Sequence, residues 1–129
     1  MTHFIISAEL STNDSSDNII STWLLRQDLV NLGFSPKEMI GCYNKSIETS
    51  FIVESIDNNS QDKLMVLAKK YKQESLLRLS VDLDVWIIYP RTDWSYSERF
   101  IGQWSEISKD QAKDNYTLDI ETGQYYDAR

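Results

Sequence analysis

The chain has 129 residues, of which 41% are hydrophobic and 26% are charged, and its formal net charge is −7. This length and balance predict one globular domain, residues 1–129, that is large enough to bury a core. The acidic charge argues against a nucleic-acid partner, which would need a basic patch. No apolar run approaches the ~20 residues that cross a bilayer, and the N-terminus has no signal-peptide pattern. We therefore expect neither a nucleic-acid nor a membrane partner.

The chain has a single cysteine, Cys42, and a single histidine. One cysteine cannot form an intrachain disulfide, and its isolation fits a reducing cytosol. Structural zinc sites are built from four Cys or His ligands, so the composition also argues against a metal site.

The N-terminal half predicts a strand, a helix and a long extended stretch. Residues 4–10 begin with apolar side chains on both faces, which is typical of a buried strand. Residues 18–32 predict a helix that ends at Gly33, a residue suited to the left-handed turn after a helix. Residues 39–56 are mostly extended, and residues 47–54 alternate apolar with polar side chains, which predicts a half-exposed strand. The apolar face of the helix is expected to consist of Ile20, Trp23, Leu24 and Val30.

A second helix is predicted from Ser60, because apolar residues recur there at helical spacing. Residues 76–81 then change to the period of a strand. Between these two segments lies Gln73-Glu74-Ser75, three polar side chains on a rigid support near a sheet end. A carboxylate held there is a candidate functional group, and the alternative is a solvated helix end. The buried face of the helix is expected to carry Leu64, Leu67, Ala68 and Tyr71.

The remainder of the chain predicts mainly strands and turns. Residues 82–84 form a tight turn, after which residues 85–89 return antiparallel. Residues 99–104 predict a further strand, with Gly102 as a candidate bulge. Glu121-Thr122-Gly123 predicts the turn of a terminal hairpin.

The order β-α-β-β-α-β followed by extra strands predicts a ferredoxin-like α+β fold with an added C-terminal β-hairpin. In that fold an antiparallel sheet carries two helices on one face and leaves the other face open. The chain is rich in Trp and Tyr, so we expect the open face to be covered. A cyclic homo-oligomer whose sheets turn inward would cover it.

Five short motifs follow one another along nearly the whole chain. They are Ser7-Ala8, Gly41-Cys42-Tyr43, Gln73-Glu74-Ser75, Glu98-Arg99 with Gly102 and Glu106-Ile107, and Tyr116-Thr117-Leu118-Asp119 with Gly123. In this order and spacing the chain resembles the small phage-encoded S-adenosylmethionine lyases, long described as hydrolases, which defeat host restriction by destroying the methyl donor. The resemblance implies a ferredoxin-like trimer with active sites between subunits, working in the cytoplasm of an infected bacterial host.

The chemistry of S-adenosylmethionine explains why such an enzyme needs no cofactor. Its sulfonium is an activated leaving group, and attack of its own carboxylate on the γ-carbon gives 5′-methylthioadenosine and L-homoserine lactone. Well-oriented intramolecular reactions reach effective molarities of about 10⁵–10⁸ M, so holding one folded conformer in a dry pocket is sufficient. Two alternatives stay open: hydrolysis to homoserine, and a non-enzymatic trimeric regulator that binds a nucleotide.

The resemblance makes Glu74 the expected catalytic residue. In a lyase it would anchor the substrate ammonium or a bound water and set the reactive conformer, and in a hydrolase it would be the base. The competing interpretation is a surface glutamate paired with a nearby lysine, which contributes ~1 kcal/mol or less.

The remaining motif residues are expected to bind the substrate. Tyr43 would stack on adenine or face the sulfonium, where a cation–π contact is worth about 0.5–2 kcal/mol, although a core tyrosine fits the pattern equally well. Cys42 is interpreted as a small buried hydrophobe rather than a nucleophile. The expected substrate-binding residues are Ser7, Gly41, Cys42, Tyr43, Gln73 and Ser75.

Overall fold

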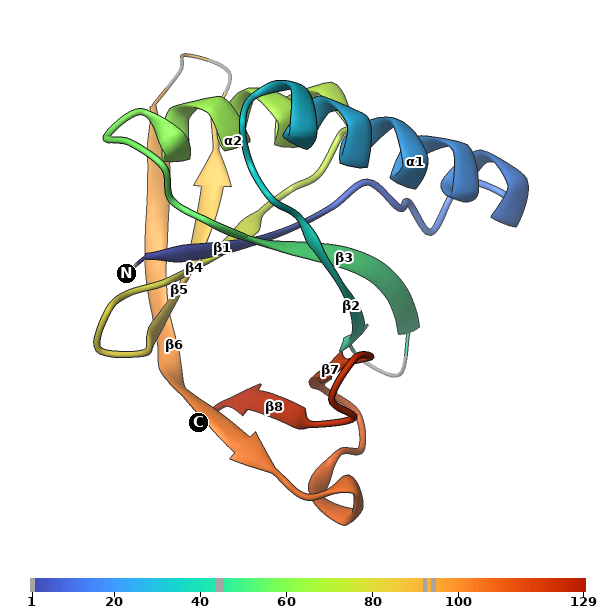
Figure 1. Ribbon diagram of the computed structural model, residues 1–129, viewed down its shortest axis with the longest axis vertical. Helices are drawn as coiled ribbons and strands as arrows, with labels where there is room; N and C mark the ends of the chain where they lie inside the picture. Colours follow the sequence, from blue (N-terminus) through green and yellow to red (C-terminus); the bar gives the residue numbers. More distant parts are fainter. Residues whose placement is uncertain (1, 44–45, 92, 94) are drawn as a thin grey trace.

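The computed structural model describes residues 2–43, 46–91, 93 and 95–129. Within these residues, eight antiparallel strands form a closed barrel, and two α-helices lie side by side against its outside (Figure 1). None of the helices described is long and apolar enough to cross a membrane. In chain order the elements are β1 (His3–Ser7), α1 (Ser15–Asn31), β2 (Lys37–Tyr43), β3 (Ser46–Glu54), α2 (Ser60–Lys70), β4 (Leu76–Leu79), β5 (Asp84–Pro90), β6 (Tyr96–Ile107), a 3-10 turn η1 (Lys109–Gln111), β7 (Tyr116–Asp119) and β8 (Tyr125–Ala128).

The predicted order of the first six elements is observed, but the ferredoxin-like open sheet is wrong. The strands follow one another around the barrel as β1-β3-β2-β7-β8-β6-β5-β4, and β4 pairs back onto β1. The C-terminal hairpin β7–β8 causes the closure, because it pairs with β2 on one side and with β6 on the other. The sheet therefore has no open second face, and the expected oligomer with inward-turned sheets loses the argument on which it rested.

Gly102 allows the sheet to close. The ladder between β5 and β6 shifts register here, so that Val85 faces Gly102 while Trp86 faces Phe100, and the predicted bulge is confirmed. Beyond the bulge, β6 leaves β5 and pairs with β8. The φ of Gly102 is +141°, and a Cβ on it would lie 2.8 Å from the backbone nitrogen of Arg129. Only glycine lets the C-terminal strand approach β6 so closely.

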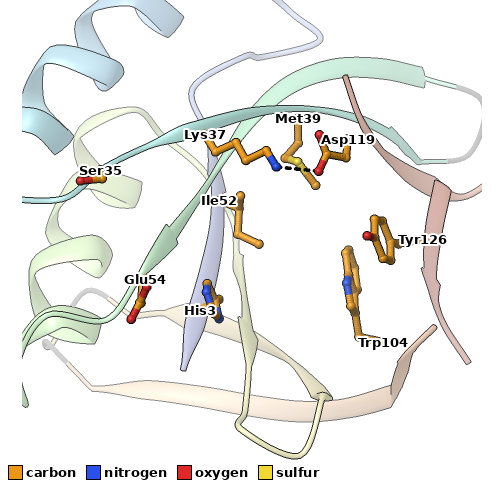
Figure 2. Close-up of a pocket in the computed structure, with 9 residues that line it drawn as sticks. All are labelled: His3, Ser35, Lys37, Met39, Ile52, Glu54, Trp104, Asp119 and Tyr126. Atoms are coloured by element: carbon orange, nitrogen blue, oxygen red, sulfur yellow. Dashed lines mark hydrogen bonds and ion pairs between the residues drawn. The ribbon is translucent and has the colours of Figure 1, made fainter. Parts of the chain in front are cut away.

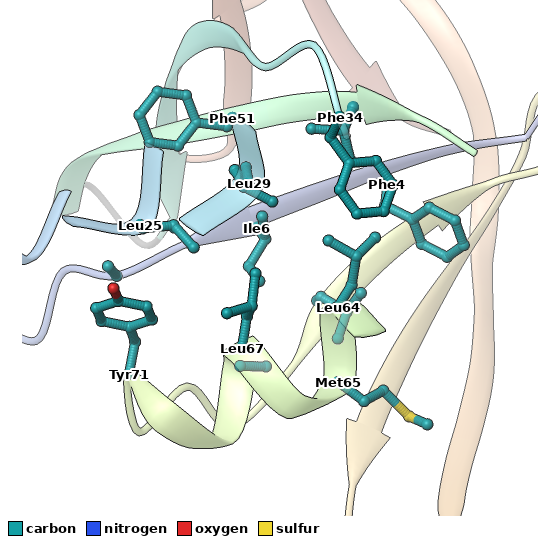
Figure 3. Packing of buried hydrophobic residues seen from close by; sticks show 14 of the residues in the cluster. Phe4, Ile6, Leu25, Leu29, Phe34, Phe51, Leu64, Met65, Leu67 and Tyr71 are labelled. Atoms are coloured by element: carbon teal, nitrogen blue, oxygen red, sulfur yellow. The ribbon is translucent and has the colours of Figure 1, made fainter. Parts of the chain in front are cut away.

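The main hydrophobic core lies outside the barrel, between its wall and the two helices (Figure 3). Side chains of a strand alternate between faces, so Phe4 and Ile6 point to the helices while Ile5 points into the lumen. The predicted buried face of α2 is confirmed, since Leu64 and Ala68 are fully buried.

The predicted buried face of α1 is wrong. The helix buries Leu25 and Leu29, which are 0% exposed, whereas Ile20 and Trp23 are 56% and 61% exposed. Apolar residues occur all around this helix, so periodicity could not select the face that meets the sheet. A broad apolar surface on α1 is left facing outward.

Candidate functional site

The predicted site residues gather at one end of the barrel, where β1 ends beside the β2–β3 hairpin. We call this the Ser7 end, defined by Ser7, Gly41, Glu48 and Ser50. Ser7 is opposite Ser50 in the ladder between β1 and β3, and Gly41 is opposite Glu48 in the ladder between β2 and β3. Ser7 is buried, and its hydroxyl donates a hydrogen bond to the carbonyl oxygen of Thr49 over 2.9 Å.

Glu9 follows the end of β1, and its side chain replaces a backbone hydrogen bond that the strand no longer makes. Its carboxylate accepts a hydrogen bond from the backbone N–H of Thr49. That N–H lies one residue beyond the last pair of β1 and β3, Ser7 with Ser50. A side chain thus replaces the missing strand partner, since a buried N–H without a partner is costly.

Gln73 is brought to the same place by the way α2 ends. Lys72 takes a left-handed conformation with φ +58°, and the N–H of Gln73 donates back to the carbonyl of Ala68 over 2.8 Å. This is the pattern of a Schellman turn, which reverses the chain after a helix. The side-chain amide of Gln73 then donates to the carbonyl oxygen of Glu9 over 2.9 Å. The structure therefore joins Gln73 to the Ser7 end, through a residue that sequence reasoning did not select.

The two neighbours of Gln73 differ in exposure. Ser75 is half-buried directly before β4. Glu74 is exposed, and its side chain makes no hydrogen bond or ion pair with the residues described in this structure. Within a single chain, Glu74 is therefore held near the Ser7 end by its backbone alone.

The Gly41-Cys42-Tyr43 motif divides between the two faces of β2. Gly41 faces the lumen, where an added Cβ would lie 3.9 Å from both Glu48 Cγ and Ser50 Oγ. Cys42 points to the other face, is buried, and donates from Sγ to the carbonyl oxygen of Asp114 over 3.4 Å. Tyr43 is 68% exposed at the end of the strand, on the face that Gly41 shares by alternation. Gly41 and Tyr43 thus belong to the Ser7 end, and Cys42 lies behind it.

Sequence reasoning missed Glu48 and Ser50, because it assigned them to the solvent side of a half-exposed strand. They face the lumen instead, since the helices cover the opposite face and the barrel closes over this one. Burial first, and the neighbouring charge of Glu9 second, raise the pKa of Glu48 to about 7. Ser50 is 4% exposed, and its hydroxyl has no hydrogen-bond partner among the described residues. The signal that could have found them is the position of Glu48 opposite Gly41, but only the register reveals it.

A groove of about 270 Å³ adjoins the Ser7 end on the outside of the barrel. Glu9 and Thr49 line it from the sheet, and Thr22, Trp23 and Arg26 line it from α1. Its volume is near the lower limit of small-molecule pockets, which span about 300–1,000 Å³.

The opposite end of the lumen holds a separate cavity of about 300 Å³ (Figure 2). An ion pair between Lys37 Nζ and Asp119 Oδ2, 2.7 Å apart, crosses its wall, and Trp104 stacks on Tyr126. None of the predicted site residues lines this cavity. In the described part of the chain, no group of three or more His, Cys, Asp or Glu residues is arranged to hold a metal ion.

The arrangement at the Ser7 end defines a class of protein: a small closed barrel of antiparallel strands with two helices outside. At one end of this barrel the carboxyl group of Glu48 lies near the buried hydroxyl of Ser50, which has no hydrogen-bond partner among the described residues. A comparison with known protein families identifies the family of this chain. Residues 4–129 match the S-adenosylmethionine lyase family, and the chain belongs to that family. The match confirms the resemblance seen in the sequence and makes the protein an enzyme that acts on S-adenosylmethionine. No curated protein matches the chain.

Proposed function

We propose that the protein cleaves S-adenosylmethionine to 5′-methylthioadenosine and L-homoserine lactone. The family match over residues 4–129 carries this proposal. In the reaction, a carboxylate oxygen of the substrate bonds to its γ-carbon, the bond from that carbon to the sulfonium breaks, and the electron pair moves to sulfur. Two opposite charges of the substrate are neutralised and no proton is transferred, so the protein needs to supply only the folded conformer and a dry surrounding.

Glu74 is proposed as the catalytic residue, which sets the reactive conformer by anchoring the substrate ammonium or a bound water. Its neighbour Gln73 is fixed to Glu9, so the backbone that carries Glu74 is fixed too. The side chain itself is exposed and the adjoining groove is small. Both features fit a site that is completed by a second copy of the chain, and we propose a trimer with its active sites between subunits.

The other predicted binding residues are proposed to contact the substrate from the same end. Ser7, Gly41 and Gln73 lie together there, Ser75 is adjacent, and Tyr43 offers an exposed ring. Cys42 would contribute by packing behind the strand.

Hydrolysis to homoserine is a second candidate, because one observation favours it. A general base works best when its pKa is near the working pH, and the pKa of Glu48 is raised to about 7. In this case a carboxylate would activate a water molecule, and water would attack the γ-carbon.

Product analysis in ¹⁸O-labelled water tests both candidates. The protein is incubated with S-adenosylmethionine, without an added cofactor. The products are separated by chromatography, and their ¹⁸O content is measured by mass spectrometry. For a lyase, unlabelled homoserine lactone appears first, and label enters only as the lactone opens. Labelled homoserine from the first time point would establish hydrolysis instead, and an unchanged substrate would contradict both.

The proposed biological role is protection of phage DNA by depletion of the methyl donor in the cytoplasm of the infected host. It is supported by the family resemblance and by a reaction that destroys this donor. Expression in a bacterium with an active adenine methyltransferase should lower methylation of its DNA. Normal methylation at a high level of active protein would contradict the role.

A further inference from the structure

We infer that Glu48 and Ser50, with Glu9 behind them, form a subsite for the α-ammonium group of the amino-acid end of the substrate. The inference rests on the proposed function and assigns one part of the ligand to one part of the Ser7 end. It is argued from the unused hydroxyl, from the two carboxylates and from the space above Gly41.

The hydroxyl of Ser50 is the observation that points to a ligand. Ser50 is only 4% exposed, yet its hydroxyl has no hydrogen-bond partner among the residues described. Leaving a buried hydroxyl unpaired is costly, so such groups in native proteins call for a specific explanation. Its nearest hydroxyl neighbour in the ladder is Ser7, which already donates to the carbonyl oxygen of Thr49. Ser50 therefore has a free acceptor and a free donor at the Ser7 end.

Glu48 lies on the same face of β3 as Ser50, two residues away. Both side chains flank the lumen side of Gly41, where a Cβ would contact each of them at 3.9 Å. Because Gly41 has no side chain, this face of β2 leaves room for a small group in contact with both the hydroxyl and the carboxylate, although Ser50 itself is buried. An ammonium group placed there would donate one hydrogen bond to each.

The charge of the two carboxylates selects a cation. Glu9 stands close enough to Glu48 to raise its pKa, in addition to the larger effect of burial. A cation bound between them would relieve both effects, since an opposite charge favours the ionised form. An ammonium fits better than the sulfonium, because it has N–H donors for Ser50 and Glu48, whereas a sulfonium has none.

This assignment also narrows the proposed role of Glu74. If Glu48 and Ser50 hold the ammonium, Glu74 is left with the second of its two proposed roles, which acts through a bound water. Substitutions of the two glutamates should then have different kinetic effects. Loss of the Glu48 carboxylate weakens substrate binding, whereas loss of the Glu74 carboxylate slows the chemical step.

Binding of two unreactive analogues to the full-length protein tests the subsite. S-adenosylhomocysteine carries the α-ammonium, and its deaminated analogue has hydrogen in that place; both are titrated by calorimetry. Wild-type protein should prefer the ammonium compound by about tenfold to a hundredfold, the range of a charged hydrogen bond. In Glu48→Gln the preference should fall to within about threefold.

Ser50→Ala and Glu54→Gln complete the test. Ser50→Ala should lose part of the preference while its melting temperature stays equal or rises, because the hydroxyl has no hydrogen bond to the described residues that it could lose. Glu54→Gln removes a carboxylate from the same strand near its far end, beside the separate cavity, and should keep the wild-type preference.

The outcomes separate this inference from the proposed function. An unchanged preference in Glu48→Gln, together with cleavage of S-adenosylmethionine by the wild type, overturns the subsite and leaves the lyase. Equal losses in Glu48→Gln and Glu54→Gln also overturn it, since the effect would then be one of overall charge. A wild-type protein that neither binds the analogues nor cleaves the substrate overturns both.

Discussion

Glu48 carries a carboxyl group whose ionisation is governed by its surroundings. In the unfolded chain it ionises near its usual pKa of 4.5, whereas in the folded protein burial and the charge of Glu9 raise the pKa to about 7. Between these two values the folded state keeps a proton that the unfolded state has lost. The free energy of unfolding therefore contains a contribution from Glu48 that is lost as the pH rises from about 4.5 through about 7.

A substitution at Glu48 should make this loss visible. Glu48→Gln cannot ionise, so its melting temperature relative to the wild type should be higher at pH 8 than at pH 5. Differential scanning calorimetry across this range measures the difference, with Glu54→Gln as the control for removal of a surface carboxylate. Parallel curves for Glu48→Gln and the wild type would show that Glu48 titrates alike in both states.

Glu74 differs from Glu48 in its surroundings, because it is exposed and its side chain makes no hydrogen bond or ion pair with the described residues. Glu74→Gln should therefore keep the melting temperature and the oligomeric state of the wild type while losing most of its turnover of S-adenosylmethionine. A loss of about 10²-fold or more in kcat would be in the range expected for a group that acts in the transition state. Glu121→Gln, a change at another exposed glutamate, is the matched control, and full activity of Glu74→Gln would remove Glu74 from the mechanism.

At the scale of elements, the barrel depends on the strand β6 changing partners at its bulge. Gly102 has φ +141° and lies against the backbone of Ala128 and Arg129, whereas Gly123 has φ +74° and no atom of the described residues within 4 Å of an added Cβ. The two glycines share a positive φ and differ in space, which makes them a natural pair for comparison.

Gly102→Ala should be the more damaging of the two substitutions. Both variants incur backbone strain of about 1–3 kcal/mol, and Gly102→Ala adds a clash that moves β8 away from β6. Urea unfolding should show a clearly larger loss of stability for Gly102→Ala than for Gly123→Ala. Equal losses would mean that the C-terminal strand does not need its close approach to β6.

The elements themselves could largely be predicted from the sequence, but the face that each presents could be predicted only in part. In α2 the apolar residues form one stripe, and Leu64 and Leu67 are buried as predicted. In α1 apolar residues occur on every side, so their spacing could not indicate that Leu25 and Leu29, rather than Trp23, would be buried. In β3 the alternation of apolar and polar residues predicts one buried and one solvent-exposed face. In the structure the helices cover one face, and the closed barrel covers the other.

At the scale of the whole molecule, the closed barrel leaves its exposed apolar surface on the outside. Ile19 and Trp23 on α1 are 69% and 61% exposed, and apolar patches of this kind commonly mark contacts between proteins. In the proposed trimer this apolar surface of α1 could form contacts between subunits. The open sheet face on which the sequence-based expectation of an oligomer rested is absent from the closed barrel.

Light scattering during size-exclusion chromatography should give the mass of three chains of 15.0 kDa each. The mass should be constant over a wide range of loading concentrations if the assembly is stable. A mass of one chain at every concentration would contradict the trimer, and would also require the active site to be complete within a single barrel.

The sequence alone determined the kind of elements, their order, the terminal hairpin and, through short motifs, the family of the protein. These features depend on local spacing, turn chemistry and residue identity, all of which can be read along the chain. The tertiary structure decided that the sheet closes, which side of α1 is buried, and that Glu9, Glu48 and Ser50 join the Ser7 end. Those outcomes depend on strand pairing between residues far apart in the chain, because register determines which side chains face one another and which are removed from water.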